Sequence, residues 1–203
     1  MESYIPEFRE ERSKNSDIVI TIDGPSGAGK GTLAEFISEK MEIPCYSAGD
    51  FFRQLASEKD LTVEELSAQA DKKTDIKVDE RTLEKGLNES CVIESRISSW
   101  VMGDYSNLRI YLTADLEERA RRVKKDAESG ERNDEEEKET LEQAKNKIKQ
   151  RDRDNKERYS DYYGIDVSNL EMYDLIIDNT DLQLEDQEQL VKKALKKRFS
   201  ERL

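Results

Sequence analysis

A glycine-rich loop constrains the fold of this chain more than any other feature of the sequence. The loop, Gly24-Pro-Ser-Gly-Ala-Gly-Lys-Gly-Thr32, follows a β-branched run at 17–23 and precedes apolar residues at helical spacing. Its glycines let successive backbone N–H groups point inward and form a nest for phosphate oxygens at the start of a helix. Lys30 adds a cation for the β- and γ-phosphates, and Thr32 offers a hydroxyl for Mg²⁺ or its waters. The sequence therefore predicts a phosphate-binding loop within an α/β fold.

The residue after the lysine narrows the class of phosphate-binding protein. Gly31 stands where the strict pattern has Ser or Thr, and Thr32 follows it. This Gly-Lys-Gly-Thr form resembles nucleoside monophosphate kinases rather than GTPases or motor ATPases. A GTPase would also carry a guanine-reading Asn-Lys-x-Asp motif, and this sequence has none.

Strands and helices alternate along the rest of the chain, which is typical of a parallel α/β sheet. The expected strands are 17–23, 45–48, 90–95, 108–113 and 175–178. The expected helices are 30–41, 50–59, 62–72, 79–88, 115–127, 134–163 and 184–202, with Asp50 capping the second. Residues 1–16 alternate charge with little apolar content and are expected to be a flexible tail. Residues 17–203 are expected to form a single domain.

Composition excludes several classes of protein. Lys and Arg number 34 and Asp and Glu 47, so the net charge is −13 and the clustered cations of a nucleic-acid-binding protein are not expected. Histidine is absent, which removes an imidazole base, a Ser-His triad and a His-ligated metal site. Two cysteines are too few for a disulfide scaffold, and no apolar run is long enough for a membrane span. We therefore expect a cytoplasmic protein without a membrane or nucleic-acid partner.

Arginines in three later segments indicate a second anionic substrate, because guanidinium groups match phosphate oxygens. Arg53 lies about one helical turn past Asp50. Arg96 ends the third expected strand, at the edge where open α/β sheets bind ligands. Arg151 and Arg158 are seven residues apart on one helix, so they share a face, although a purely solvated role is open for both.

Four motifs together resemble cytidylate kinases of the archaeal type. They are the segments 20–32, Ser47–Arg53 (SAGDFFR), Glu94–Trp100 (ESRISSW) and 158–175, and the likeness spans about 18–180. The resemblance implies transfer of the γ-phosphoryl group of ATP to CMP, and to dCMP, with Mg²⁺, by a monomer. It also implies the three-layer α/β/α fold of P-loop kinases, with a five-stranded parallel sheet in the order 2-3-1-4-5 and a short helical lid. Acceptor-binding helices are expected at about 49–88 and the lid at about 119–150, with its tip at Ser129–Asn133.

The resemblance also implies roles for individual residues. Catalytic roles fall to Lys30, Arg119 and Arg151. ATP-binding roles fall to Gly24, Pro25, Ser26, Gly27, Ala28, Gly29, Lys30, Gly31, Thr32, Arg119 and Arg122. CMP-binding roles fall to Ser47, Asp50, Arg53, Arg81, Glu94, Arg96, Arg151, Asn155 and Arg158. Thr32, directly or through water, and Glu94, through water, are the expected metal contacts. Arg81 and Ser98 or Ser99 are the expected readers of the cytosine base.

Two alternatives stay open at this point. One is a kinase of the same fold that acts on UMP or AMP, and the other is a protein that binds ATP without transferring phosphate. Phosphoryl transfer to a nucleotide needs no catalytic base, so the absence of His does not argue against a kinase. An acceptor phosphate is already an oxyanion near neutral pH, and the reaction depends on positioning and charge neutralisation.

Overall fold

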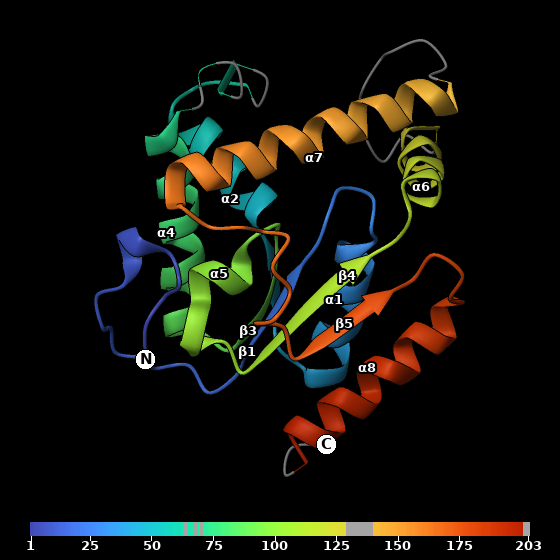
Figure 1. Ribbon diagram of the computed structural model, residues 1–203. Helices are drawn as coiled ribbons and strands as arrows, with labels where there is room; N and C mark the ends of the chain where they lie inside the picture. Colours follow the sequence, from blue (N-terminus) through green and yellow to red (C-terminus); the bar gives the residue numbers. More distant parts are fainter. Residues whose placement is uncertain (63–64, 67–68, 70, 129–139, 201–203) are drawn as a thin grey trace.

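A five-stranded parallel sheet forms the centre of the protein, and the computed structural model describes it within residues 1–62, 65–66, 69, 71–128 and 140–200 (Figure 1). The strands are β1 (Val19–Asp23), β2 (Cys45–Ser47), β3 (Cys91–Glu94), β4 (Leu108–Thr113) and β5 (Leu175–Asp178). Their order is β2-β3-β1-β4-β5, and all four neighbouring pairs are parallel. The expected sheet order is therefore confirmed.

Helices cover both faces of this sheet. They are α1 (Lys30–Met41), α2 (Ala48–Glu58), α4 (Lys72–Asn88), α5 (Ser98–Met102), α6 (Leu116–Glu128), α7 (Leu141–Tyr163) and α8 (Leu184–Arg198), with 3-10 turns η1 (Pro6–Phe8) and η2 (Gly103–Tyr105). Successive side chains of β1 point to opposite faces. Ile20 and Ile22 pack with α1 and α8, whereas Val19 packs with α4, α5 and the end of α7. The result is three layers with a hydrophobic core on each side of the sheet.

Helix α7 extends beyond these layers, and only its carboxyl-terminal end joins the core. Figure 1 shows it crossing above the carboxyl ends of β4 and β5, from α6 at one end to α4 at the other. Thr140 begins it with a capping box, in which its hydroxyl accepts from the Gln143 amide and the Gln143 side chain accepts from the Thr140 amide. Because parallel strands present their carboxyl ends to ligands, α7 forms one wall above the edge where a site is expected.

Two helices begin at other residues than predicted, because the residues that cap them differ from the expected ones. The cap of α2 is Ser47 rather than Asp50, and Asp50 takes the N3 position of a capping box with it. Helix α4 begins at Lys72 instead of residue 79, because the Asp71 carboxylate accepts from the Thr74 amide at 2.9 Å. The short helix α5 was not predicted. The expected start of α7 at 134 lies outside the described residues.

Part of the first sixteen residues packs against the domain, which differs from the expected flexible tail. Ile5 and Phe8 are 0% and 2% exposed and belong to the core on the α4 and α5 side. The Tyr4 amide donates to the Trp100 carbonyl at 3.0 Å, and Lys14 Nζ donates to the Tyr105 carbonyl at 2.7 Å. Two apolar anchors and a few backbone hydrogen bonds therefore hold a segment that composition alone describes as polar.

In the described part of the chain, no helix combines the length and the apolar character that crossing a bilayer requires.

Candidate active site

The phosphate-binding loop joins the buried strand β1 to α1, and two of its glycines are structurally required. Gly24 has a φ of 152°, and a Cβ there would lie 2.0 Å from the Leu112 carbonyl oxygen. Gly29 precedes α1 in the left-handed region, with a φ of 89°. The loop therefore turns tightly against β4 and leaves the first turn of α1 open to a ligand.

Lys30 occupies the first position of α1 and turns back over the loop. Its Nζ donates to the Pro25 carbonyl at 3.0 Å. Desolvation lowers the pKa of Lys30 to about 8, and the charges that act on it most strongly are those of Glu94, Arg96, Asp23 and Arg151. Groups from α1, the end of β3 and α7 thus converge on one place, where an anion would restore the full charge of Lys30.

Two carboxylates end the neighbouring strands β1 and β3 beneath this lysine. Glu94 pairs with Ile22 in the sheet, and its burial raises its pKa although Lys30 and Arg96 act to lower it. Asp23 is 0% exposed, and burial raises its pKa while hydrogen bonds oppose the shift. The sequence analysis did not identify Asp23 as a site residue. Its position at the end of a buried strand, directly before the loop, is the local feature that indicates one.

The buried Asp23 explains why two predicted base readers were wrong. Ser98 Oγ donates to Asp23 at 2.5 Å, and the Ser99 amide donates at 3.0 Å. Tyr173 Oη donates to the same carboxylate at 2.9 Å. Ser98 and Ser99 are both 0% exposed. They hold the floor of the loop in place and do not face a nucleotide base.

Helix α6 brings two predicted arginines to the loop. Arg119 Nη1 donates to the Ser26 carbonyl at 3.1 Å and forms an ion pair with Asp152 of α7 at 2.7 Å. Arg122 Nη1 donates to the Asn179 side-chain oxygen at 2.9 Å and to the Ala28 carbonyl at 3.3 Å. Neither Asp152 nor Asn179 was predicted, because their roles depend on contacts between distant segments.

The predicted acceptor arginine Arg96 reaches the same loop from the end of β3. Its Nη2 donates to Ser26 Oγ at 3.0 Å. Farther along α7, Arg158 Nη2 donates to the Asn155 side-chain oxygen at 2.9 Å, and its Nε lies 3.2 Å from Asp75 of α4. Burial raises the pKa of Asp75, and Arg158 acts against that rise. Asp75 was also missed by sequence reasoning.

Residues 19–181 match the model of the cytidylate kinase-like family. The chain belongs to this family. It is 33% identical over 186 residues to a cytidylate kinase of Staphylothermus marinus, covering 91% of this chain and 99% of that protein. It is 35% identical over 166 residues to a cytidylate kinase of Haloarcula marismortui, covering 79% of this chain and 80% of that protein.

Solved structures share the fold at low sequence identity. A structure of an uncharacterized protein from Eubacterium ventriosum has a TM-score of 0.66 at 20% identity and covers 90% of this chain and all of that one. Shikimate kinase from Bacteroides thetaiotaomicron has a TM-score of 0.58 at 15% identity and covers 88% of this chain and 98% of that one. The cytidylate kinase-like chain therefore has the fold of P-loop kinases.

Within this cytidylate kinase-like protein, other predicted site residues contact one another near the end of β2, where Ser47 pairs with Glu94 in the sheet. Arg53, whose side chain is 61% exposed, pairs with Asp50 at 2.5 Å. Ser47 Oγ is engaged by the same Asp50. Arg81 pairs with Glu58 across α2 and α4. Two predicted arginines, Arg53 and Arg81, thus form ion pairs with carboxylates of the chain itself.

The remaining predicted residues concern the metal and the lid of the cytidylate kinase-like protein. Thr32 is exposed in the first turn of α1. The described residues contain no group of three or more His, Cys, Asp or Glu side chains that could hold a metal ion. The lid tip Ser129–Asn133 lies outside the described residues.

Proposed function

We propose that this protein transfers the γ-phosphoryl group of ATP to CMP, and to dCMP, giving ADP and the cytidine diphosphate. The observation that carries the proposal is the contact from Arg96 to Ser26, at 3.0 Å. It joins the end of β3, where an acceptor would bind, to the loop that would hold the donor. The family assignment and the names of the archaeal relatives support cytidine monophosphate as the acceptor.

The reaction needs one bond to form and one to break. An oxygen of the acceptor phosphate attacks the γ-phosphorus while the bond from that phosphorus to the β-bridging oxygen breaks, and ADP leaves with the electron pair. The second pKa of a phosphate monoester is about 6, so the nucleophile is ionised at neutral pH without a base. Lys30, Arg119 and Arg151 would neutralise the charge that spreads over the transferring group.

Magnesium fits the oxygen donors near the loop. The Thr32 hydroxyl and the Glu94 carboxylate are hard ligands of the kind Mg²⁺ prefers, directly or through water. Because burial raises the pKa of Glu94, a cation beside it would favour its charged form. When bound with ATP, the ion would neutralise negative charge on the β- and γ-phosphates. Every other contact in the proposal comes from the side chains and backbone of the chain itself.

We further propose that the protein is a monomer and that it is located in the cytoplasm.

The test is ADP release from ATP and Mg²⁺ with CMP, dCMP, UMP, AMP and GMP offered separately. Release that strongly favours CMP and dCMP is the expected result. Preferential release with UMP or AMP would keep the kinase mechanism and overturn the assignment of cytidine. Measurable ATP binding without release for any acceptor would overturn phosphoryl transfer itself.

A further inference from the structure

The amino-terminal segment, residues 1–16, packs against the short helix α5 (Figure 1). The Tyr4 amide and Ser3 Oγ both donate to the Trp100 carbonyl, at 3.0 Å and 3.3 Å. The rings of Tyr4 and Trp100 meet edge to face, with 6.5 Å between their centroids. The match to the family model begins at residue 19, so the segment that makes these contacts lies outside the matched residues.

The contact continues into the turn that follows α5. The Asp104 amide donates to the Glu2 carbonyl at 2.9 Å. A Cβ at Gly103 would lie 2.2 Å from that carbonyl oxygen, so the two backbones touch directly there. Ile5 is 0% exposed and belongs to the same core as Met102. The amino-terminal segment thus holds the end of α5 and the start of η2 through backbone hydrogen bonds and a buried side chain.

The first turn of α5 holds the carboxylate from which the phosphate-binding loop starts. Ser98 Oγ and the Ser99 amide both donate to Asp23, and Gly24 of the loop follows directly. Ser99 Oγ also lies 2.8 Å from Thr21 Oγ1, so the same turn contacts β1 at two residues. Asp23 is 0% exposed, and a buried carboxylate needs its hydrogen-bond donors in place. A displacement of α5 would therefore shift the start of the loop.

Helix α5 is too short to fix its own position. It has five residues, Ser98–Met102, and isolated helices of that length are not stable in water. Its N-cap residue, Ile97, offers no side-chain hydrogen bond to the first turn. The helix contacts β1 and α4 in addition to the amino-terminal segment. The position of α5 is thus set by the elements packed around it, and the amino-terminal segment is one of them.

We propose that the amino-terminal segment is a positioning element for the phosphate-binding loop, acting through α5 and Asp23. While the segment is bound, α5 holds Asp23 and the loop keeps the conformation that receives the phosphates of ATP. When the segment is released, α5 loses part of its support and the loop binds ATP less tightly. The inference rests on the proposed function, since it takes the loop as the donor site, and it adds a part of the chain that the family match does not include.

A coupling of this kind is reciprocal. If release of the segment weakens ATP binding by a given factor, bound ATP must hold the segment in place by the same factor. The coupling can therefore be measured from both directions, from the segment in the wild-type protein and from ATP affinity in a variant.

The first experiment measures hydrogen exchange of single backbone amides in the wild-type protein, with and without saturating ATP and Mg²⁺. The Tyr4 and Asp104 amides report release of the segment, since each donates across its contact with α5 and η2. We expect ATP to slow their exchange by about fivefold or more. The Cys91 amide, in the core of the sheet, reports global unfolding and separates it from release of the segment. The Phe199 amide at the end of α8 is the comparison and should change by less than about twofold.

The second experiment compares two variants of the segment. Ile5→Asp places a charge at a buried position and should release the segment. Ser13→Asp adds the same charge at an exposed position of the segment and is the matched control. Trp100 is the one tryptophan of the sequence and lies against Tyr4, so its emission should move to longer wavelength in Ile5→Asp as water reaches the ring. Titration calorimetry should show a Kd for ATP raised about fivefold or more in Ile5→Asp and unchanged in Ser13→Asp.

The outcomes separate this inference from the proposed function. Ile5→Asp with a shifted emission but the same Kd for ATP as Ser13→Asp would overturn the positioning role. Unchanged exchange of the Tyr4 and Asp104 amides at saturating ATP would do the same in the wild-type protein, even where Ile5→Asp does not fold. Wild-type protein that binds ATP without transferring phosphate overturns the proposed function and leaves the positioning role in place. Wild-type protein that does not bind ATP overturns both.

Discussion

Arg119 of α6 and Asp152 of α7 form an ion pair of 2.7 Å directly beside the phosphate-binding loop. The same Arg119 Nη1 donates to the Ser26 carbonyl at 3.1 Å. The side chains are 11% and 29% exposed, so water screens the pair only in part. The contact joins the helix before the predicted lid tip to the helix after it. It also fixes the direction of an arginine that would face the transferring phosphate.

Asp152→Asn should therefore lower kcat by about tenfold through loss of this orientation, while Arg119 itself remains. The KM for CMP should change much less than kcat. Steady-state kinetics would measure both constants. Asp154→Asn, two residues along the same helix and exposed, is the control and should be near neutral. Equal kcat values for the two variants would contradict a positioning role for Asp152.

Lys30→Ala should reduce kcat by about 10²- to 10³-fold, since it removes the cation that the loop places over the donor phosphates. Thermal unfolding should show no loss of stability, because Lys30 is a desolvated cation near Arg96 and Arg151. Lys40→Ala, at the exposed end of α1, provides the comparison. Turnover of Lys30→Ala close to that of Lys40→Ala would remove Lys30 from the mechanism.

The pH dependence of ATP binding should follow Lys30. Its pKa in the free protein is about 8, so the side chain loses its charge as the pH rises through that value. Affinity for ATP should accordingly fall above pH 8, and kcat/KM for ATP should report the same inflection. Titration calorimetry between pH 6.5 and 9.5 would measure it. In Lys30→Arg the inflection should disappear, because a guanidinium stays charged throughout; an unchanged inflection would assign it to another group.

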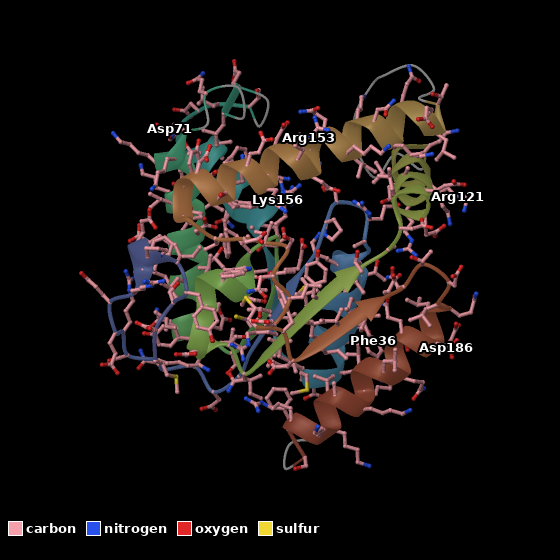
Figure 2. The ribbon with its side chains drawn as sticks, viewed as in Figure 1. Phe36, Asp71, Arg121, Arg153, Lys156 and Asp186 are labelled. Carbon is pink, nitrogen blue, oxygen red and sulfur yellow. The ribbon has the colours of Figure 1, made fainter. Side chains whose placement is uncertain are left out.

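Arg96→Ala should raise the KM for CMP far more than the KM for ATP, by about tenfold or more for CMP, since charge-assisted contacts to a phosphate would be lost. Arg121→Ala is a suitable control, because Arg121 is exposed on the outer side of α6 in Figure 2 and pairs with Glu117. Equal changes in both KM values would reject an acceptor role for Arg96.

The unfolding free energy should depend on Asp79. Tyr163 Oη donates to this buried carboxylate at 2.5 Å, and burial raises the pKa of Asp79 to about 7. The folded state thus holds a proton that the unfolded state releases near pH 4, so stability falls as the pH rises from about 4 to about 7. The loss is about 2–4 kcal/mol, from about 1.4 kcal/mol for each pKa unit. Urea unfolding at pH 5 and pH 8 should show a smaller difference in Asp79→Asn than in the wild-type protein. An identical difference would exclude Asp79 as its source.

The sequence by itself determined the phosphate-binding loop of this protein. The phosphate-binding loop is nine contiguous residues whose backbone conformation follows from its glycines and from the strand and helix on either side. Phosphate binding could therefore be predicted from the loop sequence without knowledge of any tertiary contact. The alternation of strands and helices likewise predicted the parallel sheet, and the family resemblance supplied its order.

Only the tertiary structure decided which side chains of distant helices face one another. Asp75 meets Arg158, and Asp152 meets Arg119, through packing between helices that are far apart in the sequence. In a helix crowded with charge, no local pattern distinguishes the one carboxylate that reaches a partner from those that remain solvated. Residues 1–16 show the same limit, since Ile5 and Phe8 bind a surface that exists only after the sheet and its helices have assembled. Backbone chemistry is local, whereas the pairing of long side chains depends on how the helices pack.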